Sequence, residues 1–572
     1  MKIKSLLIGM LACTALVGCT NNEEPVNNGN ENNGKKDNAY MAINIKVASD
    51  AGSRAVEDGG YVAGDANENT ITAANSIFLF YDENGKWVTS GVVTDAIPNQ
   101  EHKSESDHNG QVNDVHGSAY VVLQATQEEL QNIAQVLTVI NYSGYDALKR
   151  LDKDEALAKV TSTATDPANG AAVTNEKNAG FLMTTSTYYK DGIVNTTAVT
   201  DDNIKDSPEV ANDYPVDIYI ERAAAKVEVA TSEDPYRVTP EAPEGEVADP
   251  NDKNIVVDGV LTPVYITIDG WTLNGVVENT YLSKQLIGEW GTTAPFAGWN
   301  WAENHRSYWA KSTNWESDET LTYHAYNEAN NATGTTPAYC YENTVNGYEL
   351  DWNVGETGHK ITTVLLKAHF HVDAEGNDDA QNYYRYSGVY YSENEYKTLI
   401  LKQLQGVYAK VTTTTEGSTE KADLTADDIT LQIVSDGSTM AGVKFTVTLI
   451  AEGVQRVDGT TETVSATTIA TFINGLSYVM KAEGFLGGAC YYQVPIEHLH
   501  AALNENNVLT GVGVVRNHWY KLSIDAVRNI GEPVYNPEKE ITDIPAEVDD
   551  YYLSVKLHVL SWHVVNQGVT LK

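Results

Sequence analysis

Strict alternation of apolar and polar side chains marks the first predicted strand, at residues 40–48. Met41, Ile43, Ile45 and Val47 fall on one face, and small or polar residues fall on the other. A period of two over eight or nine residues predicts a strand that buries one of its faces.

A second alternating stretch closes the chain, at residues 551–571. Its apolar positions are Leu553, Val555, Leu557 and Val559, followed in a shifted phase by Trp562 and Val564. The shift predicts a bulge near residues 560–561. Two interpretations stay open on the pattern alone: the strand folds back into its own domain, or it pairs with a neighbouring chain.

Between these ends the pattern predicts mainly strands. Residues 76–81 and 87–88 flank the turn sequence at 82–85, which indicates a hairpin. Thr126 and Glu129 resemble a capping box, and apolar residues follow at helical spacing as far as Leu137. A second short helix is expected within residues 145–160, and one long strand at 216–229.

The first residues resemble a bacterial export signal. Lys2 and Lys4 precede an apolar stretch that ends in small residues before Cys19, the order of a lipoprotein signal. We therefore expect a signal peptide at 1–18, a lipid (palmitate) anchor on Cys19 and a disordered, polar tether at 19–39. Arg54 stands alone in a run of small and acidic residues at 50–60, so a protease could cut between Arg54 and Ala55.

Composition narrows the function. The 572 residues carry a formal net charge of -41, which disfavours nucleic acid and anionic lipid surfaces as partners. Past the signal only Cys340 and Cys490 remain, and whether they form a disulfide stays open.

Few residues suggest chemistry. His369 and His371 precede an acidic turn, but their spacing matches no standard metal site; His498 and His500 are expected to be structural. Five tryptophans could offer ring faces to sugars or could simply be core residues: Trp290, Trp299, Trp301, Trp309 and Trp315. The familiar catalytic motifs are absent from the sequence, so we expect no enzyme activity, cofactor or metal.

Several short segments together resemble the Bacteroidales-type fimbrillins, in particular the major subunit of short fimbriae, a surface lipoprotein similar to type V pilins. Besides the Cys19 and Arg54 regions, the segments are 180–185, 220–227, 281–284, 339–344, 491–496 and 513–520. Each is weak alone, and their order along the chain carries the resemblance. The acidic residues 57–58 after the Arg54 site depart from a favourable protease sequence.

The resemblance implies a mainly β protein with two transthyretin-like β-sandwich domains, at 40–225 and 226–572, and a few short helices. It implies an outer-membrane lipoprotein precursor whose first strand, 40–54, is removed by proteolysis. The donor strand of another copy, 551–571, then fills the groove, giving a head-to-tail surface fimbria that includes accessory subunits and adheres to a host or bacterial receptor. The alternative is a surface glycan-binding or tip adhesin lipoprotein.

Overall fold

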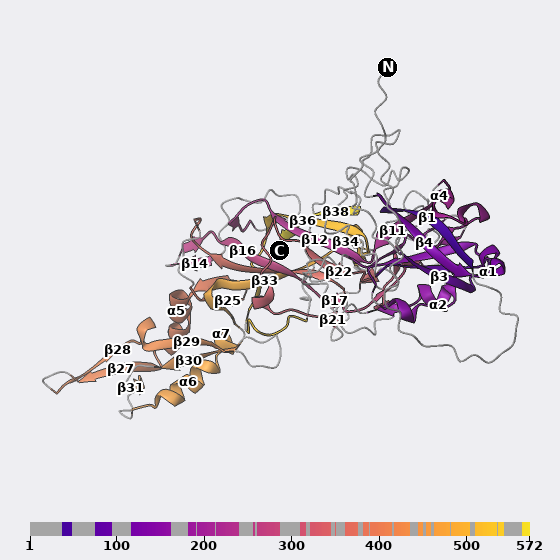
Figure 1. Ribbon diagram of the computed structural model, residues 1–572. Coiled ribbons are helices and arrows are strands. Elements are labelled where there is room, and N and C mark those ends of the chain that lie inside the picture. The colour runs from indigo at the N-terminus through magenta and orange to yellow at the C-terminus, as the bar shows by residue number, and fades with distance from the viewer. Residues whose placement is uncertain are drawn as a thin grey trace, which may run out of the picture.

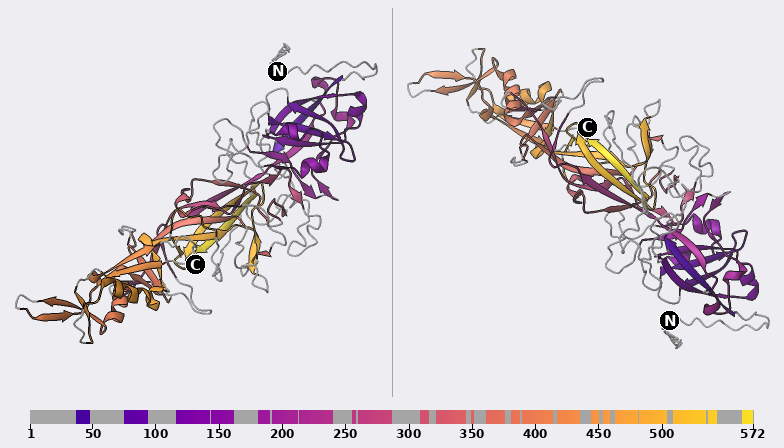
Figure 2. Two further views of the ribbon diagram at one scale, coloured as in Figure 1. Left: turned by 90° about the horizontal axis from the view of Figure 1, so that it is seen from below. Right: turned by 90° about the horizontal axis from the view of Figure 1, so that it is seen from above.

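Sheets dominate the molecule, which is elongated in all three views (Figure 1 and Figure 2). The structure is a computed structural model. It describes residues 37–47, 75–93, 116–161, 181–239, 255–286, 309–344, 349–350, 361–434, 444–542 and 563–571, except for short gaps at 143, 190–191, 212, 258–259, 316–320, 376–380, 388, 414–416, 450–452, 459–462, 481, 504–508 and 535.

An eight-stranded sheet forms one end of the molecule, with the strand order β10-β5-β2-β3-β4-β1-β11-β7. Because β7 also pairs with β5, seven of these strands form a closed ring, and β10 pairs with β5 outside that ring. The strands are β1 (Asp37–Val47), β2 (Ile77–Tyr81), β3 (Trp87–Val93), β4 (His116–Ala125), β5 (Gln135–Ile140), β7 (Met183–Thr185), β10 (Thr197–Ala198) and β11 (Val216–Arg222).

Short helices and hairpins surround this sheet. They are α1 (Gln127–Gln131), η3 (Tyr145–Ala147), α2 (Lys153–Leu157), β8 (Tyr188–Tyr189), β9 (Ile193–Val194), η5 (Asp201–Asn203) and α4 (Pro208–Ala211). The predicted hairpin is confirmed: Asp82 accepts hydrogen bonds from the backbone of Asn84 and Lys86, and Gly85 supplies the left-handed φ of 77°.

The C-terminal part is a sandwich of two sheets in its middle. One sheet contains β22 (Ala338–Tyr341), β12 (Ala224–Thr231), β36 (His518–Val527) and β38 (His563–Leu571). The other contains β13 (Tyr236–Arg237), β16 (Tyr265–Asn274), β24 (Thr363–His371), β33 (Ala489–Pro495) and β37 (Glu532–Pro533).

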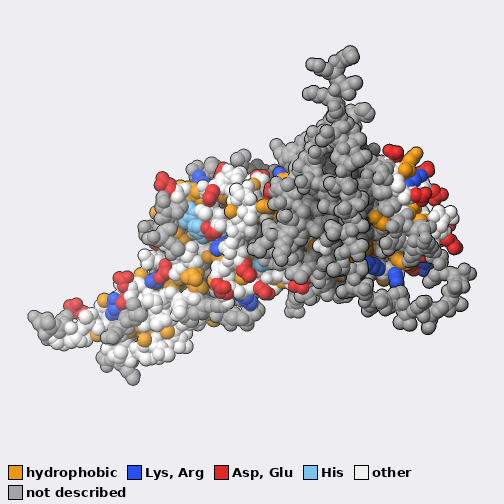
Figure 3. Space-filling view, viewed as in Figure 1, with side chains coloured by type: hydrophobic (Ala, Val, Ile, Leu, Met, Phe, Trp, Pro, Cys, Tyr) orange, Lys and Arg blue, Asp and Glu red, His pale blue; other side chains and the backbone are white. Residues whose placement is uncertain are grey.

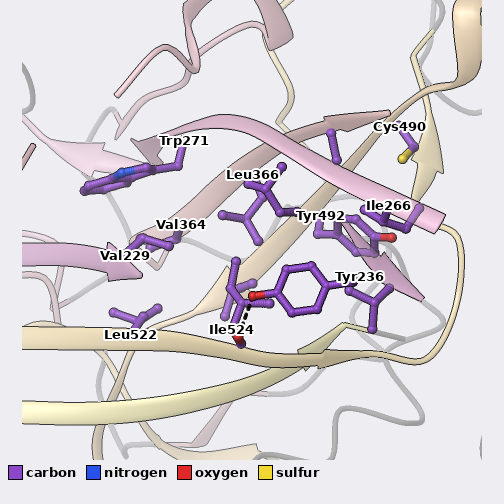
Figure 4. Packing of buried hydrophobic residues seen from close by; sticks show 14 of the residues in the cluster. Val229, Tyr236, Ile266, Trp271, Val364, Leu366, Cys490, Tyr492, Leu522 and Ile524 are labelled. Atoms are coloured by element: carbon purple, nitrogen blue, oxygen red, sulfur yellow. Dashed lines mark hydrogen bonds between the residues drawn. The ribbon is translucent and has the colours of Figure 1, made fainter. Parts of the chain in front are cut away.

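Figure 4 shows how the two sheets share one core. Leu522 and Ile524 of β36 face Leu366 of β24 and Tyr492 of β33. The Tyr236 hydroxyl donates to the Ile524 carbonyl at 2.6 Å, so the polar tip of this buried ring is satisfied.

A further sheet extends the sandwich away from the eight-stranded sheet. It contains β15 (Val260–Thr262), β14 (Ile255–Val257), β26 (Val389–Ser392), β25 (Tyr383–Tyr386) and β32 (Glu483–Phe485). Between β26 and β32 the chain builds a separate body, residues 393–482, which we call the distal unit; it lies at the opposite end of the molecule from β1 (Figure 1).

The distal unit has its own hydrophobic core, which includes Ile400, Leu449 and Ile473. Its elements are α5 (Glu393–Leu404), β27 (Tyr408–Thr413), β28 (Thr419–Ala422), η8 (Ala426–Asp428), β29 (Ile429–Val434), β30 (Lys444–Leu449), β31 (Val454–Arg456), α6 (Ala466–Asn474) and α7 (Ser477–Met480). Sequence patterns did not predict this unit.

Small pairings complete the fold. They are β17 (Val276–Val277) with β21 (Leu321–Thr322), β18 (Thr280–Tyr281) with β6 (Val160–Thr161), β19 (Gln285–Leu286) with β20 (Ala310–Lys311), and β35 (Leu509–Val512) between β23 (Glu349–Leu350) and β34 (Glu497–Leu503), with single turns η7 (Tyr326–Glu328) and η9 (Leu486–Gly488). In the described part of the chain, no helix is both long and apolar enough to span a bilayer.

The mainly β class with short helices is confirmed, and two local predictions are wrong. The capping box of Thr126 and Glu129 is present, but α1 stops at Gln131 and the following apolar residues form β5. The single long strand predicted at 216–229 is two strands, β11 and β12, which separate at Ala223 and enter different sheets. The domain division at residue 225 stays a prediction.

Candidate functional site

The first strand lies inside a sheet, between two partners. β1 pairs antiparallel with β4, from Asp37 opposite Ala125 to Lys46 opposite His116. On its other side it pairs in parallel with β11, from Ile43 opposite Val216 to Val47 opposite Ile220. Without β1, the adjacent backbone groups of β4 and β11 would lose their partners, so its position is a slot with two hydrogen-bonding edges.

The predicted inward face of β1 is buried where the structure describes it. Met41 and Ile43 are fully buried, and Ala39 is 3% exposed, in the core formed by Phe78, Val121, Ile218 and their neighbours. Burial of Met41 and Ile43 contributes about 1.5–3 kcal/mol each. For Ile45 and Val47 only the backbone pairing is described.

The last strand lies at an edge. β38 pairs in parallel with β36, from His518 opposite His563 to Val527 opposite Leu571, and is the end strand of its sheet. Val564 therefore pairs within its own chain, opposite Trp519. Leu553, Val555, Leu557, Val559 and Trp562 lie outside the described residues, as do Cys19, Arg54 and Ala55.

A buried charged cluster joins the eight-stranded sheet to the sandwich; we call it the junction network. Arg222, the last residue of β11, donates from Nη1 to Asn517 Oδ1 at 3.1 Å. Arg516 Nε lies 3.3 Å from Glu342 Oε2, and Lys284 Nζ lies 3.9 Å from Glu221 Oε2. All six side chains belong to residues that are at most 2% exposed.

Arg516 is the best-satisfied member of the junction network. Besides Glu342, its guanidinium donates to the carbonyls of Leu282 at 3.1 Å and Tyr281 at 3.0 Å, and to the Thr280 hydroxyl at 3.2 Å. Burial raises the pKa of Glu221, while Lys284 and Arg516 oppose that rise. These contacts fix the place where the chain leaves one sheet and enters the next.

The junction network brings together four of the segments that carry the fimbrillin resemblance. Residues 220–227, 281–284, 339–344 and 513–520 are far apart in the chain, and each contributes at least one member. The signal in the sequence was a charged pair, Glu221–Arg222, inside an apolar stretch. Buried charges need partners, but the sequence alone does not say which.

The remaining candidates have structural surroundings. His369 Nδ1 lies 2.9 Å from Asp269 Oδ2, and His371 contacts the Thr267 hydroxyl and the Asp373 carbonyl. His498 Nδ1 contacts the Tyr520 hydroxyl at 2.9 Å; the side chain of His500 is outside the described set. Among described residues, no three His, Cys, Asp or Glu side chains are grouped to hold a metal.

Cys340 and Cys490 are both buried free thiols in this structure. Burial raises the pKa of Cys340 to about 12. Trp309 is fully buried and Trp315 is 7% exposed, so neither offers an open ring face to a sugar. Trp290, Trp299 and Trp301 lie outside the described residues.

Part of the chain matches one known protein family. Residues 483–568 match the family described as "Major fimbrial subunit protein type IV, Fimbrillin, C-terminal". The match begins at β32 and ends within β38, so it includes β33 and β36 of the sandwich core. No curated protein sequence matches the chain.

Solved structures give distant similarities. The tip fimbrial protein Mfa3 from Porphyromonas gingivalis, with a C-terminal truncation, is 14% identical; the match covers 57% of this chain and 77% of that one, with a TM-score of 0.27. A fimbrial assembly protein from Parabacteroides distasonis is 10% identical, over 73% of this chain and 98% of that one, with a TM-score of 0.26.

Proposed function

From the match of residues 483–568 to the fimbrillin C-terminal family, we propose that this chain is a fimbrillin-type, non-catalytic subunit that polymerises by exchange of its first strand. In this proposal the exported precursor is lipidated at Cys19 and cut after Arg54. β1 then leaves, and the C-terminal strand of a neighbouring copy or accessory subunit takes its place. The resulting surface fimbria mediates adhesion.

The position of β1 is the observation that supports this proposal. A strand held by β4 on one side and β11 on the other cannot leave without exposing two unpaired edges and the core beneath Met41 and Ile43. Such a slot binds an extended strand through main-chain hydrogen bonds, and alternate side chains fill the vacated core. Because donor and acceptor surfaces differ, the contact repeats head to tail.

The edge position of β38 is consistent with a donor. Among the described strands, β38 is bonded on one side only, so its release breaks fewer backbone hydrogen bonds than the release of an interior strand. The junction network supports the other half of the proposal. Through Arg222 it ties β11, one wall of the slot, to Asn517, the residue just before β36, which is the partner of β38.

The experiment compares Arg54→Gln with Arg150→Gln, which changes an exposed arginine elsewhere in the same part of the chain. We expect Arg150→Gln to give a ladder on an unboiled denaturing gel and a surface form that begins at Ala55. We expect Arg54→Gln, and separately deletion of 551–571, to abolish the ladder. An undiminished ladder in either variant contradicts the proposal.

A further inference from the structure

The eight-stranded sheet splits along one edge of β5. The first residues of β5 pair with β10, as in Val136 opposite Thr197. The last residues pair instead with β7, as in Val139 opposite Thr184. Between these two pairings the neighbouring strand changes, and a cavity of about 470 Å³ opens there, bounded by β5, β7, β10 and β11.

The walls of this cavity combine apolar side chains with polar and acidic ones. Glu83 and Asp217 contribute exposed carboxylates, and Thr196 and Thr197 contribute hydroxyl groups. Among the described residues that line it there is no lysine, arginine or histidine. With a chain charge of -41, this lining disfavours a phosphate, sulfate or carboxylate ligand.

One aromatic ring stands beside these groups. Tyr219 is 44% exposed because it lies on the face of β11 opposite the buried Ile218 and Ile220. Asp217 lies two residues earlier and therefore on the same face. An exposed ring next to a carboxylate offers one apolar surface and one strong hydrogen-bond acceptor.

The polar floor is held in place before any ligand arrives. Gln135 donates from Nε2 to the Asp82 carbonyl at 2.7 Å and accepts from the Thr196 hydroxyl at 2.7 Å. Ser186, which also lines the cavity, is 3% exposed, and its hydroxyl has no hydrogen-bond partner among the described residues. Gln135 and Thr196 are therefore positioned by contacts within the protein itself.

We propose that this cavity, between β10 and β11, binds a neutral, hydroxyl-rich ligand of the size of a mono- or disaccharide. Its volume falls in the range of small-molecule sites. Carboxylates accept hydrogen bonds from sugar hydroxyls, protein hydroxyls accept from them or donate to them, and the Tyr219 ring covers the apolar face of a sugar. A metal is disfavoured because no group of three ligating side chains forms among the described residues.

The test uses the purified full-length chain and saturation-transfer NMR. The probes are the methyl glycosides of glucose, galactose, mannose, fucose and N-acetylglucosamine, with the methyl glycoside of sialic acid as the anionic comparison. We expect saturation transfer to at least one neutral glycoside, with a dissociation constant on the order of 1 mM, and none to the sialoside.

Variants locate the binding site. Tyr219→Ala and Asp217→Asn should each weaken binding by roughly tenfold or more, and Tyr219→Phe should retain it because the ring remains. Tyr214→Ala is the matched control, since Tyr214 is 48% exposed and does not line the cavity. Thermal melting verifies that each variant is folded.

Three results would overturn the proposal: no transfer to any neutral glycoside, a preference for the sialoside, or unchanged binding in folded Tyr219→Ala. The site does not depend on polymerisation. A chain that binds glycosides but never forms a ladder would therefore refute the proposed function and leave this inference intact.

Discussion

At the scale of single residues, buried charges are the least expected feature of this β protein. Arg516 and Glu342 are both nearly inaccessible to water, so each depends on the other and on neighbouring carbonyls for solvation. Removing one partner of such a pair costs more than the pair contributes, because the other charge stays buried.

We expect Arg516→Met to lower the free energy of unfolding by about 3–5 kcal/mol. The control is Arg456→Met, because Arg456 forms an ion pair with Asp458 whose two side chains are 54% and 57% exposed. Surface pairs contribute about 0–1 kcal/mol. Denaturant unfolding of both variants measures the difference; equal small losses would mean that the junction network is not held by charge.

His369 gives the protein a dependence on pH. Its hydrogen bond with Asp269 raises its pKa, and burial opposes the rise. Since the folded pKa lies above the unfolded value of about 6.5, this stabilisation is complete below that value and is lost as pH rises through the folded pKa.

Asp269→Asn should therefore destabilise the protein more at about pH 5 than at about pH 9. Asp458→Asn serves as control, since it removes a carboxylate from an exposed ion pair that contains no histidine. Thermal melting at the two pH values is sufficient. A larger effect of Asp269→Asn at the higher pH would contradict the assignment.

At the scale of elements, β1 stabilises the uncut chain through few but fully buried side chains. Ile43→Ala should lower the free energy of unfolding by about 2–5 kcal/mol, because the surrounding core collapses only partly into the space. Ile193→Ala, the same change at a 42% exposed position of β9, should stay within about 0.5 kcal/mol. Chemical denaturation compares the two, and similar losses would argue against a tightly packed slot.

The elements also show how far sequence patterns reach. The alternating pattern predicted β1, and the turn sequence Asp82–Gly85 predicted the hairpin of β2 and β3. Both signals are local. The prediction that the helix continues to Leu137 is wrong because residues 135–140 form a strand that pairs with β2 on one side and β7 on the other. Here tertiary pairing outweighs the helical spacing of apolar residues.

Long-range features were not predictable in the same way. Two backbone hydrogen bonds set the strand break at Ala223. The Ala223 N–H donates to the Leu182 carbonyl at 2.9 Å, and the Asn517 backbone N–H donates to the Ala224 carbonyl at 2.8 Å. The cavity beside Tyr219 depends on β10 and β7 sharing one edge of β5. No pattern within one segment encodes contacts between segments so far apart.

At the scale of the whole molecule, acidic side chains are visible at both ends of the surface (Figure 3). The distal unit is the part furthest from β1 (Figure 2), and its core, apart from Tyr384 and its partly buried neighbours Tyr386 and Tyr391, comes from its own residues. Its stability should therefore vary independently of the eight-stranded sheet.

Ile473→Ala should speed hydrogen exchange throughout residues 393–482 and leave exchange in β1 unchanged. The neighbouring Phe472 is 40% exposed, and its ring packs edge to face on Tyr408 with 5.8 Å between the ring centroids. Phe472→Ala should therefore have a smaller effect. Exchange measured by mass spectrometry separates the two regions. Faster exchange in β1 after Ile473→Ala would show that the two bodies unfold together.

The interior position of β1 has a mechanical consequence. A strand bordered on both sides and pulled along its own axis resists in shear, so many bonds must fail at once, whereas an edge strand peeled sideways loses them one after another. A fibre whose joints occupy this position would withstand stretching far better than bending loads that lift the strand out of the sheet. Single-molecule pulling along the two directions would reveal that anisotropy.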